Sequence, residues 1–186
     1  RLYAQGAADH FDWVESLGVP YKRAVYMERT VVPFSDESLL FTGNERAWPF
    51  TEVAQPVPRG HVPSKEGDEG GRMFMQALMA AVESEGVLLK TDARVVAILQ
   101  DDSGRVRGVA ARIDGEECYI QASRGVVLTA GGFVMNRDML EKHAPQTRPY
   151  GEPYGNQWDM GDGIQMGVAA GGNAINMNEC FISFAF

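Results

Sequence analysis

The chain has 186 residues, 45% of them hydrophobic, which is enough for one domain with a sizeable core and is not typical of a disordered protein. Its formal net charge is −8 and it has no basic stripe, which argues against nucleic acid as a partner. No apolar run approaches the roughly 20 residues that a membrane-spanning helix needs. Cys118 and Cys180 lie far apart in the sequence, which argues against a zinc site or a disulfide framework and favours a reducing, cytoplasmic compartment.

Residues 1–63 are predicted to form a cleft wall or lid. Apolar residues at helical spacing predict a helix over residues 7–17, closed by Gly18. The chain from residue 19 to residue 63 has little periodicity and is expected to be irregular. It contains several prolines and many aromatic side chains, namely Tyr21, Tyr26, Phe34, Phe41, Trp48 and Phe50. Arg59 and His61 flank a glycine here and are the two candidate cations for a substrate; alternatively, the Arg59 guanidinium bonds loop carbonyls.

Residues 64–136 are predicted to form a second segment with a helix and a sheet. Apolar spacing predicts a helix over residues 72–85, and the period then changes to two. Strands are expected at residues 87–90, 93–100, 105–113 and 117–121, the last three as a meander with turns at 101–104 and 114–115. The acidic residues at these turns are interpreted as solvated charges and not as a metal cluster. Residues 137–186 form the third predicted segment, a return toward the substrate domain.

The stretch from Gly125 to Asn136 is the strongest candidate for a ligand site. Residues 125–128 are apolar and β-branched, which predicts a strand buried on both faces. Thr129-Ala130-Gly131-Gly132 follows, and Asn136 is placed to cap a helix over residues 137–143. Small residues let a flat or anionic ligand reach main-chain N–H groups. A β-branched side chain at Gly131 is expected to fill the ligand's space and to demand a forbidden backbone angle. The alternative is a tight turn without a ligand.

A second glycine motif, Gly161-Asp162-Gly163, is predicted to open a helix over residues 164–172. The N–H groups and the positive end of the helix dipole could face an anion or a sugar hydroxyl at that point. The alternative is that Asp162 is an N-cap and nothing more.

The order of these motifs resembles the fumarate reductase/succinate dehydrogenase flavoprotein family over residues 60 to 178. Residues 1–63 are more similar to the 3-ketosteroid dehydrogenase branch, particularly its 3-oxo-5α-steroid 4-dehydrogenase members. The resemblance implies an α/β fold, as an α+β fragment: part of a Rossmann-like FAD-binding domain with a three-stranded β-meander. The N-terminal Gly-x-Gly-x-x-Gly unit of the family is absent. Both ends of the chain, at Arg1 and Phe186, are therefore expected to be cut from a longer polypeptide, whose remainder would be a partner.

The resemblance also implies which residues bind FAD. The main chain of Val95 would meet the adenine, and Asp162 and Gly163 would lie near the flavin. The pyrophosphate and ribityl region would be bordered by Thr129, Ala130, Gly131, Gly132, Phe133 and Asn136. The sequence departs from the family at two places: Thr129-Ala130 replaces Ala-Thr, and Met160 stands where the family has threonine.

The function implied for the parent protein is an FAD-dependent oxidoreductase that acts on CH–CH groups, with a 3-ketosteroid or a similar small apolar ketone as substrate and a separate electron acceptor. A base would remove the proton made acidic by the carbonyl, and the flavin would accept a hydride. The resemblance implies a tyrosine base, but none is assigned; Tyr150 and Tyr154 are interpreted as packing residues. One alternative is fumarate reduction, which the absence of a histidine after Gly172 disfavours. Another is that the chain alone is a non-catalytic structural fragment, which is not expected to hold FAD.

Overall fold

A computed structural model describes residues 2–30, 34–65 and 69–180. The chain divides into two compact units, residues 1–88 and residues 89–186, which are described separately. The three-part division expected from the sequence stays a prediction. Within the described ranges, no helix combines the length and the hydropathy that would let it cross a bilayer.

The first unit contains two long helices, as predicted. Helix α1 spans Leu2–Ser16, and Gly18 follows it with a left-handed φ of 91°. Helix α3 spans Gly70–Ser84, within two residues of the predicted bounds. Val14 of α1 is buried, and Val19 just after the helix is only 2% exposed. These two valines join Leu40 and Phe41 in the small core of this unit.

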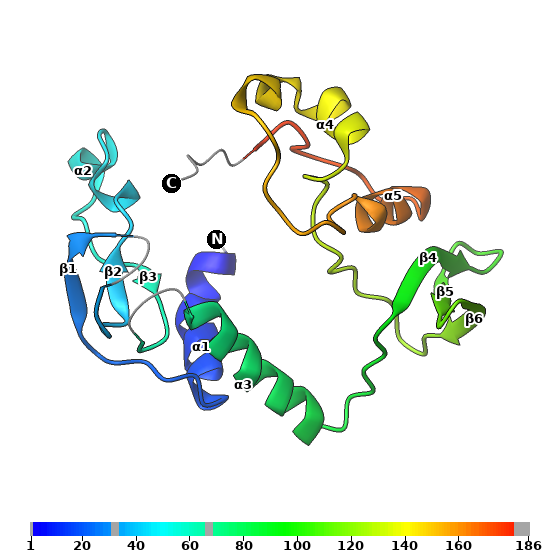
Figure 1. Cartoon of the computed structure of the whole chain (residues 1–186), viewed down its shortest axis with the longest axis horizontal. Coiled ribbons are helices and arrows are strands. Elements are labelled where there is room, and N and C mark those ends of the chain that lie inside the picture. The colour runs from blue at the N-terminus through cyan, green and yellow to red at the C-terminus, as the bar shows by residue number, and fades with distance from the viewer. Residues whose placement is uncertain (1, 31–33, 66–68, 181–186) are drawn as a thin grey trace. The chain divides into compact units, whose positions relative to one another are not determined.

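The segment predicted to be irregular contains a small mixed sheet. Strand β1 spans Val25–Arg29, β2 spans Leu39–Phe41 and β3 spans Gly60–His61; β2 pairs parallel with β1 and antiparallel with β3 (Figure 1). The short helices η1, Asn44–Arg46, and α2, Phe50–Val53, connect β2 to β3. The prediction of irregular chain is wrong for these elements. Strands of two to five residues are too short to show an alternation that sequence periodicity can detect.

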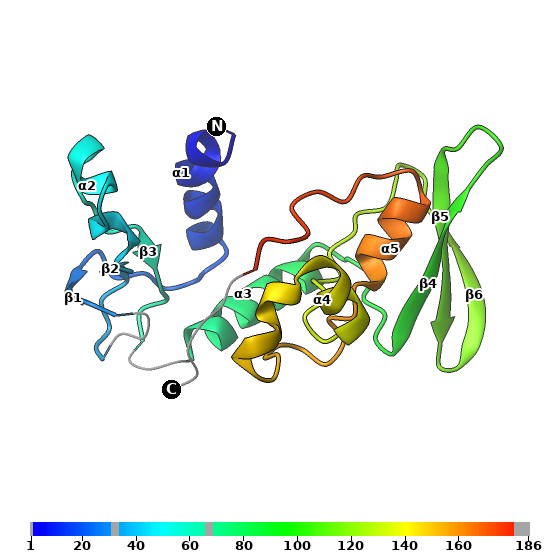
Figure 2. The same cartoon turned by 90° about the horizontal axis from the view of Figure 1, so that it is seen from above.

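The second unit is built on the predicted β-meander. Strand β4 spans Ala93–Gln100, β5 spans Val106–Ile113 and β6 spans Glu116–Gln121, all antiparallel in the order β4-β5-β6 (Figure 2). Ile113 pairs with Glu116 across the two-residue turn Asp114-Gly115, in which both residues have positive φ. That geometry matches the twist of a hairpin, which explains the Asp-Gly pair. The central strand carries the buried residues Val109, Ala110 and Ala111.

Two other predicted strands are absent from the described chain. Residues 87–90 have no regular structure, and Leu88 is 91% exposed. Residues 125–128 are likewise unpaired, and Val127 is 84% exposed, so the prediction of a strand buried on both faces is wrong here. A strand needs at least one hydrogen-bonded neighbour, and no strand of the described residues pairs with this run. The hydrophobicity of residues 125–128 indicates a preference for a buried strand, but it does not show whether neighbouring strands are available to pair with it.

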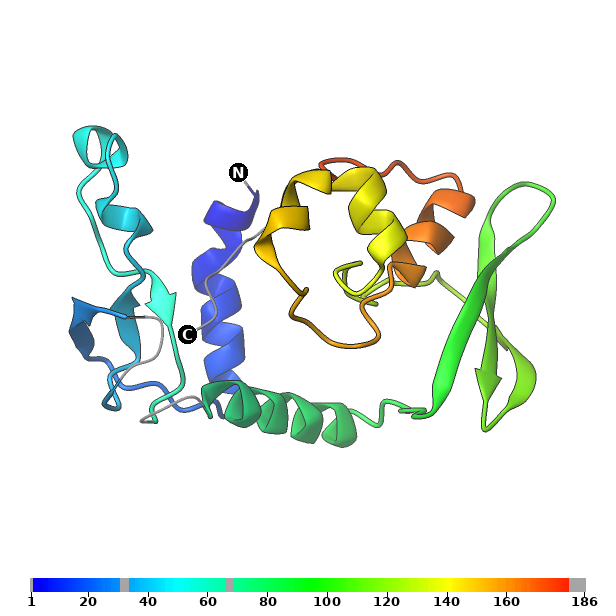
Figure 3. The same ribbon diagram turned by 45° about the horizontal axis from the view of Figure 1, so that its top comes forward.

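Three short helices complete the second unit: α4 over Arg137–His143, η2 over Pro145–Tyr150 and α5 over Asp162–Ala169. Helix α5 packs against β4, and α4 lies next to α5 (Figures 1 and 3). Two side-chain bonds fix α5 along the strand: Arg94 reaches Asp162 at one end of the helix, and Gln100 Nε2 donates to the Ala170 carbonyl, 3.2 Å away, at the other.

Candidate functional site

The glycine turn, residues 129–133, lies against the start of helix α5. The Gly161 N–H donates to the Gly132 carbonyl oxygen at 2.9 Å. Gly163 is buried, and a Cβ atom on it would meet the Ala130 Cβ at 3.0 Å. The two glycine motifs, 30 residues apart in sequence, are therefore neighbours, and small residues on both sides permit the close approach.

Asn136 connects the chain after the glycine turn to the segment before α5, and it is the N-cap of helix α4. Its Oδ1 accepts the Met139 N–H at 3.0 Å, which is the predicted N-cap. Its Nδ2 donates to the Met160 carbonyl at 2.8 Å, in the segment just before α5. One amide side chain thus satisfies a helix end with its oxygen and holds the Gly161 region with its nitrogen.

Main-chain donors gather at this junction. Within the part of the chain that the structure describes, the N–H groups of residues 129–133 donate no hydrogen bond. The same holds for residues 162–164 at the start of α5, where the helix dipole is positive. Free N–H groups beside a helix N-terminus and small side chains form an arrangement that can bind an anionic or hydroxyl-rich ligand through main chain alone.

The two central glycines of the turn face different surroundings. Gly131 has a φ of 71°, and a Cβ atom there would collide with the Asp159 carboxylate. Gly132 has nothing within 4 Å of an added Cβ atom. The expected backbone reason for glycine at position 131 is therefore confirmed, while the expectation that a side chain there would fill the ligand's space stays a prediction. Open space lies at Gly132 instead.

Arg94 connects strand β4 to this junction. Its Nη2 lies 3.1 Å from Asp162 Oδ2, and both side chains are largely exposed. Asp162 is the first residue of α5, while the N-cap is Gly161, which makes no side-chain cap bond. The alternative in which Asp162 is only an N-cap is therefore wrong. Val95, next to Arg94, pairs with Ala111 at an irregularity of the strand, and no described contact joins Val95 itself to the glycine turn.

Most predicted cofactor residues are thus brought together by the fold. They are Thr129, Ala130, Gly131, Gly132, Phe133, Asn136, Asp162 and Gly163. Phe133 also contacts His143 of α4, with the ring centroids 6.0 Å apart. Their role in binding stays a prediction. Sequence reasoning missed Arg94 and Asp159, because neither lies in a glycine motif and their contacts cross 68 and 28 residues of chain.

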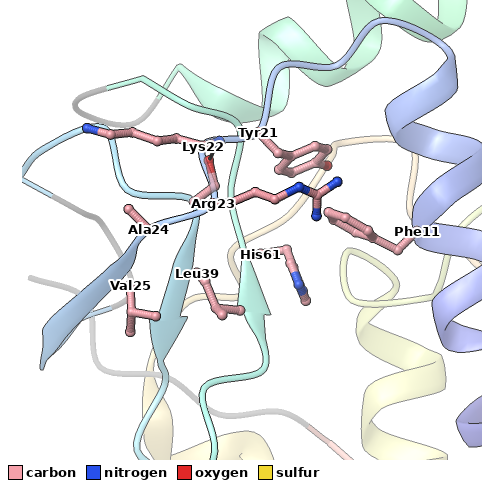
Figure 4. A pocket seen from close by; sticks show the side chains of 9 residues that line it. Phe11, Tyr21, Lys22, Arg23, Ala24, Val25, Leu39 and His61 are labelled. Atoms are coloured by element: carbon pink, nitrogen blue, oxygen red, sulfur yellow. Dashed lines mark hydrogen bonds between the residues drawn. The ribbon is translucent and has the colours of Figure 1, made fainter.

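The first unit has a small pocket of its own. It encloses about 190 Å³ and is lined by Phe11, Tyr21, Arg23, Leu39 and His61 among others (Figure 4). Burial raises the pKa of the Tyr21 phenol, and the nearby Glu15 carboxylate raises it further. The volume is below the roughly 300 Å³ at which small-molecule sites begin, so this pocket alone is too small for a four-ring ligand.

The expectations about single residues outside the glycine motifs meet mixed outcomes. His61 lines this pocket and packs against Phe11, with ring centroids 4.5 Å apart. The Arg59 side chain is exposed and donates to no loop carbonyl of the described residues, so that alternative is wrong. Tyr154 is 100% exposed, so its interpretation as a packing residue is also wrong. The side chain of Tyr150 lies outside those described.

Known proteins similar to this chain fall into two groups. A 3-ketosteroid-Δ4-(5α)-dehydrogenase from Rhodococcus jostii RHA1, solved in complex with 4-androstene-3,17-dione, matches 95% of this chain with 38% identity and a TM-score of 0.88. A 3-oxosteroid 1-dehydrogenase from Comamonas testosteroni is 34% identical over 102 residues, 54% of this chain. A probable fumarate reductase from Shewanella frigidimarina is 24% identical over 95% of the chain.

The chain spans only part of each of these proteins: 37% of the first, 18% of the second and 26% of the third. The fold class, an α+β part of an FAD-binding flavoenzyme, is confirmed by the first match. The resemblance to ketosteroid dehydrogenases and fumarate reductases is confirmed by all three. A profile of the FAD binding domain family matches residues 1–184, so this chain belongs to that family of oxidoreductases, and its cofactor is FAD.

Proposed function

We propose that this chain is part of an FAD-dependent oxidoreductase that desaturates a 3-ketosteroid or a similar apolar ketone. The similarity that carries this proposal is the 38% identity, over 95% of this chain, to the steroid dehydrogenase solved with 4-androstene-3,17-dione. The fumarate reductases are also similar over most of the chain, but at lower identity. Arg59 and His61 are the two cations considered for a dicarboxylate, and so small a cluster would not offset the desolvation of two carboxylates.

The reaction would remove two hydrogens from adjacent carbons and form a C=C bond. One leaves as a proton, which a base removes; the nearby ketone makes that proton acidic. FAD supplies the acceptor for the other, which leaves as a hydride, and a separate electron acceptor then reoxidises the cofactor. No residue of this chain is assigned as the base.

We further propose that the glycine turn and the start of α5 hold the cofactor. The predicted binding residues are those of the sequence analysis, with Val95 meeting the adenine. Support comes from the free N–H groups of residues 129–133 and 162–164, which suit a dianion bound by an acidic chain. Gly132 adds a second argument. Its φ is not left-handed and its missing Cβ atom leaves open space, so the described chain itself does not require glycine there. A ligand lying against the turn would require it.

Gly132→Val tests this site in the full-length protein. The added side chain meets no described atom, so we expect the apoprotein to keep its melting temperature while FAD binding weakens at least tenfold, as measured by flavin fluorescence titration. Gly71→Val, at another glycine with open surroundings but in the exposed helix α3, is the matched control and should leave FAD binding unchanged. Full FAD retention by Gly132→Val would contradict the assignment.

The substrate class is tested separately, by a dye-coupled assay of the full-length protein. We expect oxidation of a saturated 3-ketosteroid and no reaction with succinate or fumarate. Reduction of fumarate by the reduced enzyme, without turnover of any steroid ketone, would instead favour the fumarate reductase alternative. If neither class reacts, both substrate assignments are wrong. The alternative that the chain alone is a non-catalytic fragment is tested by the same assay on the isolated 186 residues, where turnover would contradict it.

We infer the cytoplasm as the compartment. Cys118 and Cys180 are both free thiols, which suits a reducing environment. Thiol labelling of the protein isolated from cell fractions tests this inference, and recovery of the protein from the periplasmic fraction would contradict it.

A further inference from the structure

Asp159 joins three pieces of the candidate site. Its Oδ2 accepts the Asn156 N–H at 3.2 Å, and its own N–H donates to the Asn156 carbonyl at 2.9 Å, which closes a tight turn. Its carbonyl accepts the Met135 N–H at 3.0 Å, just after the glycine turn. Its Oδ1 lies against Gly131, where an added Cβ atom would collide with it. One residue therefore contacts the middle of the turn, the chain just after the turn and the loop that leads into α5.

The contact with Gly131 disfavours a larger residue at that position. A Cβ atom there would collide with Asp159 Oδ1, so the carboxylate would have to shift to admit it. The left-handed φ of 71° adds a second reason, because L-residues rarely adopt it. Gly131 is therefore explained by Asp159 and by backbone conformation, without a ligand.

The position of Asp159 also determines which side of the turn can accept an anion. The Asp159 carboxylate is half-buried and lies on the Gly131 side, where it would repel a phosphate. The Gly132 side is open and has no such carboxylate within 4 Å of an added Cβ atom. A dianion is therefore better accommodated on the Gly132 side of the turn than beside the Asp159 carboxylate.

We propose that Asp159 is a positioning residue that holds the glycine turn in its cofactor-binding conformation and directs the cofactor to the Gly132 side. This inference rests on the proposed FAD site, but it concerns a residue outside both glycine motifs. Asp159 itself does not touch the cofactor; it acts through the conformation of Gly131 and through the loop of residues 155–161.

A double-mutant cycle in the full-length protein tests the proposal, with FAD dissociation constants from fluorescence titration and apoprotein melting temperatures as the two readouts. Asp159→Ala removes the hydrogen bond from the Asn156 N–H and the carboxylate beside Gly131 but keeps the main-chain bond to Met135. FAD binding should weaken about three- to tenfold, the size of one lost hydrogen bond. Asp159→Asn keeps an oxygen acceptor of the same size and should restore most of the affinity. Gly131→Ala should weaken binding more than either.

The decisive result is the coupling between the two positions. In the Asp159→Ala background the collision is gone, so Gly131→Ala should cost less there than in the wild type, and the two effects should be strongly non-additive. Additive effects on the FAD dissociation constant, or an Asp159→Ala variant that binds FAD as tightly as the wild type, would overturn the proposal. Equal losses in Asp159→Ala and Asp159→Asn would also overturn it.

The variant Gly132→Val shows whether a negative result concerns the role of Asp159 alone or the proposed FAD site as a whole. If Gly132→Val abolishes FAD binding while the cycle is additive, the site stands and only the role of Asp159 is wrong. If Gly132→Val binds FAD normally, the site itself is wrong, and the role of Asp159 falls with it.

Discussion

Asn136 allows two local interactions to be separated by substitution. Asn136→Ala removes both the N-cap bond to Met139 and the bond from Nδ2 to the Met160 carbonyl. Loss of a cap costs about 1 kcal/mol, and loss of one further hydrogen bond costs about 0.5–1.5 kcal/mol. The free energy of local opening of α4 should therefore fall by roughly 2 kcal/mol, which is close to a thirtyfold increase in the open population.

Asn136→Asp distinguishes the two contributions. Aspartate caps a helix as well as asparagine does, and its charge interacts favourably with the helix dipole, but it has no N–H to donate to Met160. We expect a loss of about 1 kcal/mol, all of it from the bond to Met160. Asn178→Ala is the control, because among the described residues its exposed side chain makes a single long hydrogen bond, 3.4 Å to Glu179, and its loss should change nothing measurable.

Hydrogen exchange followed by mass spectrometry suits this measurement, because it reports local opening within the full-length protein. Peptides covering residues 137–143 should exchange fastest in Asn136→Ala, more slowly in Asn136→Asp and most slowly in the wild type. Peptides from the β-meander should be unaffected. Equal protection in Asn136→Asp and Asn136→Ala would mean that the cap contributes nothing, and the reasoning from these two distances would be refuted.

Two further predictions concern the β-meander. Gly108→Ala should destabilise the second unit by about 1–3 kcal/mol, because its Cβ atom would collide with the Ile120 carbonyl across the sheet. Gly71→Ala, in open surroundings in α3, should instead stabilise the first unit by about 0.5–1 kcal/mol. Urea titration of both variants checks the contrast. The Asp101 carboxyl has its pKa lowered to about 2 by hydrogen bonds from the Ser103 hydroxyl and then the Arg107 guanidinium. A lowered folded-state pKa stabilises the β4–β5 turn above pH 4, and this contribution is lost as the pH falls from about 4 to 2. In Asp101→Asn, protection of the amides of residues 101–105 from exchange should no longer change over this pH range. A variant with the same pH profile as the wild type would disprove the role of Asp101.

The sequence predicted best those elements whose signals are local. The β4–β5–β6 meander followed from alternation and from the Asp-Gly turn, and Asn136 was identified as a cap from its place before a helical run. Local rules suffice there, because turns, caps and hairpins depend on residues a few positions apart.

The predictions that failed depend on contacts between distant residues. The β1–β2–β3 sheet pairs strands too short for a periodic signal, and its parallel pair joins Val25 to Leu39. The backbone conformation at Gly131 was anticipated, but its contact with the Asp159 carboxylate, 28 residues further along the chain, was not. A glycine in a sequence indicates that a side chain would not fit at that position, but the sequence does not show which neighbouring atom excludes it.

The extended run of residues 125–130 has a consequence for how the polypeptide behaves during synthesis. The neighbouring meander closes through hairpins and can form as soon as it is made, whereas this run has no pairing partner among the described residues. Until neighbours arrive, its main chain and the exposed Val127 present a strand edge on which another copy can pair. Residues 125–130 are therefore where aggregation of an incompletely folded chain should start, and a charge introduced at Val127 should reduce it.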